Sequence, residues 1–399
     1  MSLQLLDIQT RNAVLYSMSK LVKEEQNAIL NANKKDMANY TGEDIAMRDR
    51  LKVDGSKIDG MIDSLDQLAA LNDPLGIERF QFTHENGMHI SNKTAPFGTI
   101  LIIYESRPDV TIEAAGIAFK SGNKILLKGG KESLESNLVL VSLWHKALKE
   151  HHAPADWVTY LQYNRTETQG FLENPTQKLD LIVPRGGERL IAFVKQHASC
   201  PVIVSGRGNN FLFVDKAADA KMALDIIINA KTAKISACNA LDKVLIHADF
   251  PNKEIFIKAL ISELKKKDVE ILTDGDLDSF EGTERISSEA VWFEEFLDYK
   301  IVIGQVKNLM EATEKINKYG GGHSAVIVSS NNETATVFMN AVDSAAVYHN
   351  ASTRFTDGFQ FGLGGELAIS TDKLHQRGPM GLQHLVTNKW YILGDGQIR

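Results

Sequence analysis

The sequence contains few cysteines, with only Cys200 and Cys238 among 399 residues. Two thiols cannot form a disulfide framework or a four-cysteine metal site. The 11 histidines are scattered, and the only adjacent pair, His151 and His152, does not share a helix face. We therefore expect no metal site, and we expect both thiols to stay reduced in the cytoplasm.

Long apolar runs and an excess of basic residues are also missing. No segment approaches the roughly 20 apolar residues of a membrane span, and residues 1–17 contain no apolar run typical of a signal peptide. Lys and Arg number 44 against 51 Asp and Glu, which gives a formal net charge of −7. We therefore expect neither a membrane nor a nucleic acid as a partner.

The apolar pattern predicts an α/β protein. At 399 residues the chain is longer than a single core usually grows, so its length predicts two domains. Residues 1–75 have a helical period. Continuous apolar segments then alternate with helical ones, with strands expected near 99–105, 124–130, 157–162, 179–184, 211–215, 243–247, 300–306 and 324–330. This alternation is typical of doubly wound parallel sheets that are covered on both faces.

Two segments interrupt this alternation. Residues 78–90 alternate apolar and polar side chains up to Asn86-Gly87, which predicts a hairpin with a two-residue turn. Because an isolated hairpin is marginal in water, we expect it to pair with a distant segment or with another subunit. The polar segment 271–290 is expected to be an exposed loop.

The chain lacks both G-x-G-x-x-G and Walker A sequences, but two glycine pairs each follow a strand and precede a helix. The first segment comprises Lys128, Gly129, Gly130 and Lys131, and the second comprises Arg185, Gly186 and Gly187. Glycine at such a junction lets the backbone approach a phosphate, and the helix start presents N–H groups. A tight turn explains either pair alone equally well, but both pairs in one sheet favour a dinucleotide.

Cys238 lies in a polar segment that contains Lys and Ser and is followed by Asn239. Most cysteines are small buried hydrophobic residues, and Cys200, at the start of a predicted strand, fits that description. Cys238 fits it poorly, because the backbone N–H groups and lysines of a polar loop favour a thiolate. We therefore favour a nucleophile at Cys238 over a packed thiol.

The segment 350–366 is polar and rich in glycine. Long loops inside compact domains are often functional. Ser352, Thr353 and Arg354 can hold a carboxylate or a phosphate, but an ordinary surface arginine is equally consistent with the sequence.

Taken together, six long segments resemble the gamma-glutamyl phosphate reductase family, a branch of the aldehyde dehydrogenase superfamily. They are "YESRPDVTIEAAGIAFKSGN", "LLKGGKESLESN", "LDLIVPRGGERLI", "NAKTAKISACNA", "VDSAAVYHNASTRFTDGFQFGLGGELAIST" and "RGPMGLQHLVTNKWYILGDGQIR", in the family's order. The resemblance implies an aldehyde dehydrogenase-like α/β fold. Its parts would be an NADP-binding domain (1–77 and 98–207), a catalytic domain (208–355) and a small β oligomerisation element (78–97 and 375–399).

The resemblance also implies a reaction, the NADPH-dependent reduction of L-glutamyl 5-phosphate to glutamate 5-semialdehyde in proline biosynthesis. The family's nucleophile falls on Cys238, whose thiolate would displace phosphate and form a thioester for reduction. The backbone N–H of Cys238 and Ser106 would hold the oxyanion. Arg107, Asn239 and residues 352–354 are then expected near the substrate.

The resemblance further assigns cofactor roles. It implies that Lys128 lies near the adenosine ribose, that residues 185–187 lie near the pyrophosphate and that Glu295 binds the nicotinamide ribose. Lys131 stands where NAD-preferring relatives often carry Glu, and a lysine attracts the 2′-phosphate that a carboxylate repels. We therefore expect NADPH rather than NADH. The resemblance also implies a homodimer or homotetramer and transient contact with a glutamate kinase.

The chain departs from the family pattern in several places. Asn209 and Asn210 stand where a His-containing stretch is expected, Asp242 replaces a more usual Glu, and "GGHSAVIVS" lacks a Glu. Residues 205–208 offer no glutamate base like that of hydrolytic relatives, which suits phosphate rather than water. Two alternatives stay open: a related thiol-dependent dehydrogenase for another acyl group, and a non-catalytic cofactor-binding homologue.

Overall fold

A computed structural model describes residues 5–204, 206, 208–277, 280–373 and 376–399. The chain divides into two compact units, each with its own parallel sheet and core. The first comprises Met1–Ser205, Gly362–Ala368 and Met380–Arg399, and the second comprises Gly206–Phe361 and Ile369–Pro379. The predicted α/β fold is thus confirmed. The predicted boundary at residue 207 and the predicted start of the tail at residue 375 lie outside the described residues.

The first unit begins with four helices, as the helical period predicted. They are α1 (Ile8–Glu24), α2 (Gln26–Asn39), α3 (Ile45–Leu51) and α4 (Gly55–Ala70). Aspartates cap three of them, and the carboxylate of Asp7 accepts from the N–H of Thr10 at 2.7 Å at the start of α1. Within the described residues, no helix is long and apolar enough to cross a membrane.

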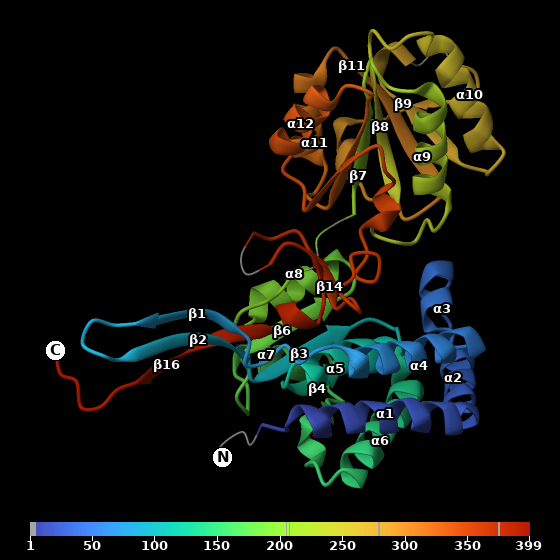
Figure 1. Ribbon diagram of the computed structural model, residues 1–399. Helices are drawn as coiled ribbons and strands as arrows, with labels where there is room; N and C mark the ends of the chain where they lie inside the picture. Colours follow the sequence, from blue (N-terminus) through green and yellow to red (C-terminus); the bar gives the residue numbers. More distant parts are fainter. Residues whose placement is uncertain (1–4, 205, 207, 278–279, 374–375) are drawn as a thin grey trace. The chain divides into compact units, whose positions relative to one another are not determined.

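The sheet of the first unit is parallel and has helices on both faces (Figure 1). Its strand order is β5 (Val158–Tyr160), β4 (Lys124–Lys128), β3 (Thr99–Tyr104) and β6 (Leu181–Arg185). Ile100 and Ile102 face α5 (Val110–Lys120), α6 (Leu134–Glu150), α1 and α4. Leu101 and Ile103 face α7 (Arg165–Glu173) and α8 (Glu188–His197). The carboxyl ends of β4 and β6 therefore carry the two glycine segments that the sequence singled out.

The predicted hairpin forms part of a three-stranded antiparallel sheet. Its strands are β1 (Glu78–Thr83), β2 (His89–Pro96) and β16 (Val386–Leu393), so the distant partner is the C-terminal strand. The predicted two-residue turn is wrong. Five residues separate the strands, because the N–H of His84 donates to the carbonyl of Met88 and the N–H of Gly87 to that of His84, each at 2.8 Å. Gly87 supplies the positive φ of 90° that this longer turn uses.

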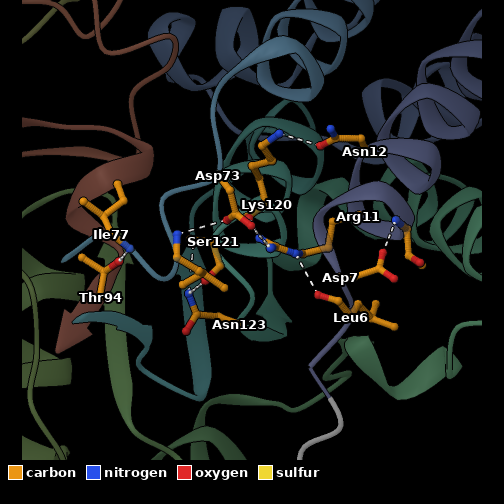
Figure 2. Close-up of polar contacts among 12 residues, drawn as sticks. Leu6, Asp7, Arg11, Asn12, Asp73, Ile77, Thr94, Lys120, Ser121 and Asn123 are labelled. Carbon is orange, nitrogen blue, oxygen red and sulfur yellow. Dashed lines mark hydrogen bonds and ion pairs between the residues drawn. The ribbon is translucent and has the colours of Figure 1, made fainter. Parts of the chain in front are cut away.

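A buried charge cluster holds α1, α4 and α5 together, and Figure 2 shows its side chains. The Arg11 guanidinium pairs with Asp73 at 2.7 Å and donates to the carbonyls of Leu6 and Lys120. The Lys120 ammonium, which is fully buried, donates to Asn12 at 2.5 Å and to the carbonyl of Ala69 at 3.1 Å. Two buried cations therefore share one carboxylate.

The second unit contains a seven-stranded sheet. Its strand order is β10 (Glu284–Arg285), β9 (Glu270–Thr273), β11 (Lys300–Val306), β8 (Leu241–His247), β7 (Asn210–Val214), β12 (Ser324–Val328) and β13 (Ala346–His349). Leu212 and Val214 face α9 (Ala220–Thr232) and α10 (Lys253–Lys265). Phe211 and Phe213 face α11 (Leu309–Tyr319) and α12 (Asn332–Ala341) (Figure 1). The strands β14 (Ala368–Ser370) and β15 (Gly378–Met380) form a separate pair.

The prediction of an exposed loop over 271–290 is wrong at its start. Ile271 and Leu272 belong to β9 and are buried, because they pair in parallel with β11 and pack into the cores on both faces of the sheet. The short strand β10 then pairs with β9. Residues 278–279 of the predicted loop lie outside the described residues.

The Lys120 cluster predicts a pH dependence of stability. Burial, with Arg11 nearby, lowers the pKa of Lys120 to about 8, whereas an unfolded lysine titrates at about 10.4. The unfolded chain therefore binds an extra proton between these values, and the folded protein loses stability as the pH falls from about 10 to about 8. Urea unfolding at several pH values should show this loss in the wild type relative to Lys120→Met. Lys20→Met, at an exposed position of α1, is the control: it keeps Lys120, so its stability should fall with pH in parallel with wild type. A Lys120→Met protein whose stability also falls in parallel with wild type would contradict the prediction.

Candidate active site

The main chain of Cys238 is fixed by the start of β7. The amide nitrogen of Asn210 donates toward the carbonyls of Gly208 at 2.7 Å, Cys238 at 2.8 Å and Ala240 at 2.6 Å. A Cβ atom on Gly208 would lie 1.7 Å from the carbonyl oxygen of Cys238, so only glycine fits there. The loop between α9 and β8 is therefore held by β7 on its main-chain side.

Asn239 links Cys238 to the predicted substrate segment. Its side-chain amide donates to the carbonyls of Thr356 at 2.9 Å and Arg354 at 3.3 Å. The hydroxyl of Thr353 donates to the carbonyl of Asn239 at 2.6 Å. Residues 353–355 form a short 3-10 helix that begins after Ser352, whose hydroxyl accepts from the N–H of Arg354 at 3.3 Å. The structure thus brings Cys238, Asn239, Ser352, Thr353 and Arg354 into one cluster.

Arg354 is the cation of this cluster. Its side chain is half-buried, and its Nη1 is buried with no hydrogen-bond partner among the described residues. Burial lowers the pKa of Arg354, while the charges of Cys238 and Asp357 act in the opposite direction. The guanidinium is therefore positioned to act on an anion at the cysteine.

A second buried network holds the segment that contains Glu295. The Lys231 ammonium pairs with Asp242 at 3.0 Å, and the other carboxylate oxygen of Asp242 accepts from the N–H of Phe296 at 3.0 Å. Lys243 donates to the carbonyl of Glu294 at 2.8 Å, and its Nζ lies 3.7 Å from the centre of the Phe296 ring. Burial lowers the pKa of Lys243 to about 7. Residues 294–296 are thus fixed to β8, the strand that follows the nucleophile.

A buried polar chain, for which the sequence gives no signal, continues from Asn210 away from Cys238. The Ser324 hydroxyl lies 2.9 Å from Nδ1 of His323 and 2.8 Å from the hydroxyl of Thr356, and the Ser324 N–H donates to Asn210 at 3.1 Å. Burial lowers the pKa of His323 to about 4, so the imidazole is neutral at physiological pH. From the sequence, Asn210 is recognisable only as a departure from the family pattern. Nothing in the sequence indicates that its side chain contacts three main-chain carbonyls.

The segment from Lys128 to Lys131 lies in the first unit, at the end of β4. A Cβ on Gly129 would lie 2.3 Å from the amide nitrogen of Asn137, and one on Gly130 would lie 2.8 Å from the hydroxyl of Ser106. Close packing alone therefore requires both glycines. Lys128 is half-buried and donates to the carbonyl of Gly129 at 2.8 Å, and burial lowers its pKa. Lys131 begins a short 3-10 helix before α6.

The start of α8 binds an anionic oxygen in this structure. The N–H of Gly187 donates to the carboxylate of Glu105 at 3.0 Å, and the Glu105 side chain packs against Gly186. An N–H group at this helix start thus donates to an anionic oxygen, as binding of a dinucleotide phosphate requires. With the lysines of the preceding segment, the residues present fit a dinucleotide cofactor.

Ser106 and Arg107 follow Glu105 in the first unit. The Ser106 hydroxyl donates to Glu132 at 3.0 Å, and the Arg107 guanidinium pairs with Asp109 at 2.9 Å. The predicted site residues are therefore divided between the units. The first unit carries residues 106–107, 128–131 and 185–187, and the second carries Cys238, Asn239, Glu295 and residues 352–354.

Comparisons with known proteins agree on one family. The model of the aldehyde dehydrogenase family matches residues 2–279. The chain is 42% identical over 391 residues to gamma-glutamyl phosphate reductase of Clostridium botulinum (strain Eklund 17B), covering 98% of this chain and 94% of the relative. It is 39% identical over 400 residues to that of Geobacillus sp. (strain WCH70), covering 100% and 96%. The crystal structure of the Thermotoga maritima enzyme of the same name matches with a TM-score of 0.94 and 39% identity, covering 100% and 96%.

The contact between Gly208 and Cys238 predicts a sharp steric effect. A Gly208→Ala substitution should displace the main chain of Cys238 and slow alkylation of its thiol by iodoacetamide on the order of tenfold or more. Mass spectrometry of the Cys238 peptide measures the rate, and Cys200 in the same protein is the internal reference. The control is Gly60→Ala in α4, where a Cβ meets nothing within 4 Å. A folded Gly208→Ala protein with the wild-type alkylation rate would refute the steric argument.

Proposed function

The chain belongs to the aldehyde dehydrogenase family and, within it, to the gamma-glutamyl phosphate reductases, and from this membership we propose that it works with NADPH and through a thioester on Cys238. It is an oxidoreductase that reduces L-glutamyl 5-phosphate to glutamate 5-semialdehyde in proline biosynthesis. The observation that carries the proposed mechanism is the cluster around Cys238, in which the nucleophile's main chain is fixed and a cation lies beside it.

The proposed reaction begins with the thiolate of Cys238. Its sulfur forms a bond to the acyl carbon, the bond from that carbon to the phosphate oxygen breaks, and phosphate leaves with the electron pair. The nicotinamide cofactor supplies the hydride that reduces the resulting thioester. The hemithioacetal then collapses to the aldehyde and releases the thiolate of Cys238, which restores the enzyme.

The oxyanion formed during these steps requires fixed donors. We assign this role to the backbone N–H of Cys238 and, from the family resemblance, to Ser106. Asn210 and Asn239 fix the main chain on either side of that N–H, so the donor is set before the substrate arrives. Arg107, Asn239 and residues 352–354 are proposed to surround the substrate.

The cofactor is proposed to be NADPH. Lys128 and Lys131 supply positive charge at the end of β4, and the N–H of Gly187 already donates to an anionic oxygen. Lys131 would attract a 2′-phosphate, whereas a carboxylate in its place would repel it. Lys128 and residues 185–187 would hold the ribose and the phosphates. Glu295, on the segment fixed by Asp242 and Lys243, would hold the nicotinamide ribose.

The enzyme is also proposed to be a homodimer or homotetramer. The three-stranded sheet exposes large apolar side chains on β1 and β16, which a second copy can cover. They are Phe80, Phe82, Trp390, Tyr391, Ile392 and Leu393. We further propose a cytoplasmic location, where Cys238 stays reduced, and transient contact with a glutamate kinase that would deliver the labile acyl phosphate.

The reverse reaction tests the substrate and the nucleophile together. Wild type with glutamate 5-semialdehyde and NADP⁺ should form NADPH over many turnovers, measured by steady-state absorbance, only when inorganic phosphate is present to discharge the thioester. Cys238→Ala should lose this activity, whereas Cys200→Ala should retain it, because burial raises the pKa of the Cys200 thiol to about 11 and keeps it protonated. Turnover that needs no phosphate would indicate a dehydrogenase for another acyl group, and cofactor binding without turnover would indicate a non-catalytic homologue.

Reversing the charge of residue 131 tests the proposed preference for NADPH. Lys131→Glu should weaken NADPH binding at least about tenfold and shift the preference toward NADH, because the new carboxylate repels the 2′-phosphate. Fluorescence titration with both cofactors gives the dissociation constants. Lys216→Glu, which makes the same change at an exposed position of the second unit, is the control. If the ratio of the NADPH and NADH dissociation constants is unchanged in Lys131→Glu, Lys131 does not contact the 2′-phosphate and this assignment is wrong.

A further inference from the structure

Arg354 carries a buried donor that the protein itself leaves unused. Nη1 of its guanidinium has no hydrogen-bond partner among the described residues. Buried polar groups in native proteins are nearly always paired, and a charged donor loses most when it is not. An unpaired guanidinium nitrogen in the cluster around Cys238 therefore indicates an anionic group that arrives with the substrate.

The place of Arg354 is set by the residue that follows the nucleophile. Asn239 accepts at its carbonyl from Thr353 at 2.6 Å and donates with its side chain to the carbonyl of Arg354 at 3.3 Å. Both bonds tie the 3-10 helix at 353–355 to the cysteine loop. The charge of Cys238 also favours the charged form of the guanidinium, so both groups belong to this one cluster.

The carboxylate that acts on Arg354 does not complete this site. Asp357 interacts with the guanidinium electrostatically, but one of its oxygens accepts from the N–H of Phe359 at 2.9 Å and of Gln360 at 3.2 Å. Nη1 remains without a partner even with Asp357 nearby. The positive charge is therefore still available to a ligand.

Glutamyl phosphate brings two anionic groups, and their distances from the reacting carbon differ. The phosphate is bonded through oxygen to the carbon that the sulfur attacks, and reacting atoms approach to roughly 3–3.5 Å. The α-carboxylate lies at the other end of the side chain, several bonds away. A cation in the cluster around Cys238 is therefore expected to meet the phosphate before the α-carboxylate, and a guanidinium matches phosphate oxygens with paired N–H donors.

We propose that Arg354 binds the phosphate group of the acyl phosphate and, in the reverse direction, the incoming inorganic phosphate. This inference rests on the proposed thioester mechanism. In the forward direction the guanidinium stabilises the charge that gathers on the phosphate as the carbon–oxygen bond breaks. In reverse it holds phosphate while one of its oxygens attacks the thioester carbon, and the carbon–sulfur bond breaks to release the thiolate of Cys238.

The reverse reaction separates the phosphate from the rest of the substrate, because semialdehyde and inorganic phosphate are added independently. Arg354→Gln should raise the KM for phosphate, and for arsenate in its place, at least about tenfold. The KM for semialdehyde should change less than about threefold. In rapid mixing without phosphate, the first turnover of NADPH formation should keep its wild-type amplitude, since thioester formation needs no phosphate. Arg285→Gln, which removes an exposed guanidinium of the same unit, is the control.

The kinetic results distinguish the roles that Arg354 could have. A raised phosphate KM with a normal first turnover supports the proposal and shows that the variant is folded. If the semialdehyde KM rises instead, Arg354 binds the carboxylate and the proposal is wrong. If Arg354→Gln loses the first turnover, Arg354→Lys is measured next. Loss of the first turnover in Arg354→Lys as well would mean that Arg354 acts on the Cys238 thiol, and the proposal would be wrong. A normal first turnover with a raised phosphate KM in Arg354→Lys would support the proposal. A wild type that needs no phosphate refutes the proposed function itself.

Discussion

The close approach of β7 to the cysteine loop is the constraint on which the catalytic half of this protein depends. Gly208 leaves no room for a side chain against the carbonyl of Cys238, and the amide of Asn210 lies within 2.8 Å of that same carbonyl. The main chain of Cys238 is therefore set by the start of a buried strand as well as by its own loop. Because Asn239 continues the network to residues 353–356, fixing this main chain also fixes the segment that carries Arg354.

Both units use buried charge to hold segments that are distant in sequence. In the first unit Arg11 and Lys120 share Asp73, and in the second Lys231 and Lys243 lie beside Asp242. In each case the surplus positive charge is spread over main-chain carbonyls, such as that of Glu294. Removing one member would leave an uncompensated buried group, which costs more than the pair contributes. Such networks fix geometry, and here they fix the junction of three helices and the segment that carries Glu295.

The sequence predicts the alternating strands and helices because buried parallel strands are continuous apolar runs. It also singles out Cys238 as the candidate nucleophile, since a polar loop is an unusual place for one of only two cysteines, and this role stays a prediction. The expectation that the hairpin pairs with a distant segment is confirmed by β16, although the strand bounds and the register come from the structure alone. The sequence fails at β9, which lies in a segment whose polar residues outnumber its apolar ones and which is buried by pairing with β11. The role of Asn210 also could not be predicted, because its side chain contacts the carbonyls of Gly208, Cys238 and Ala240, and no sequence motif indicates these contacts.

The same steric limits explain how a thioester on Cys238 would escape hydrolysis. A carboxylate base just before β7 would have to stand on residues 205–208. Gly206 has no room, because a Cβ there would lie 2.0 Å from the hydroxyl of Thr371, and Gly208 is closed by Cys238 itself. Ser205 and Arg207, which lie outside the described residues, carry no carboxylate. This segment therefore supplies no base that could activate water. A thioester on Cys238 would then react with hydride or with phosphate instead. The reaction with phosphate requires a cation to hold the anion, and Arg354 is the proposed group.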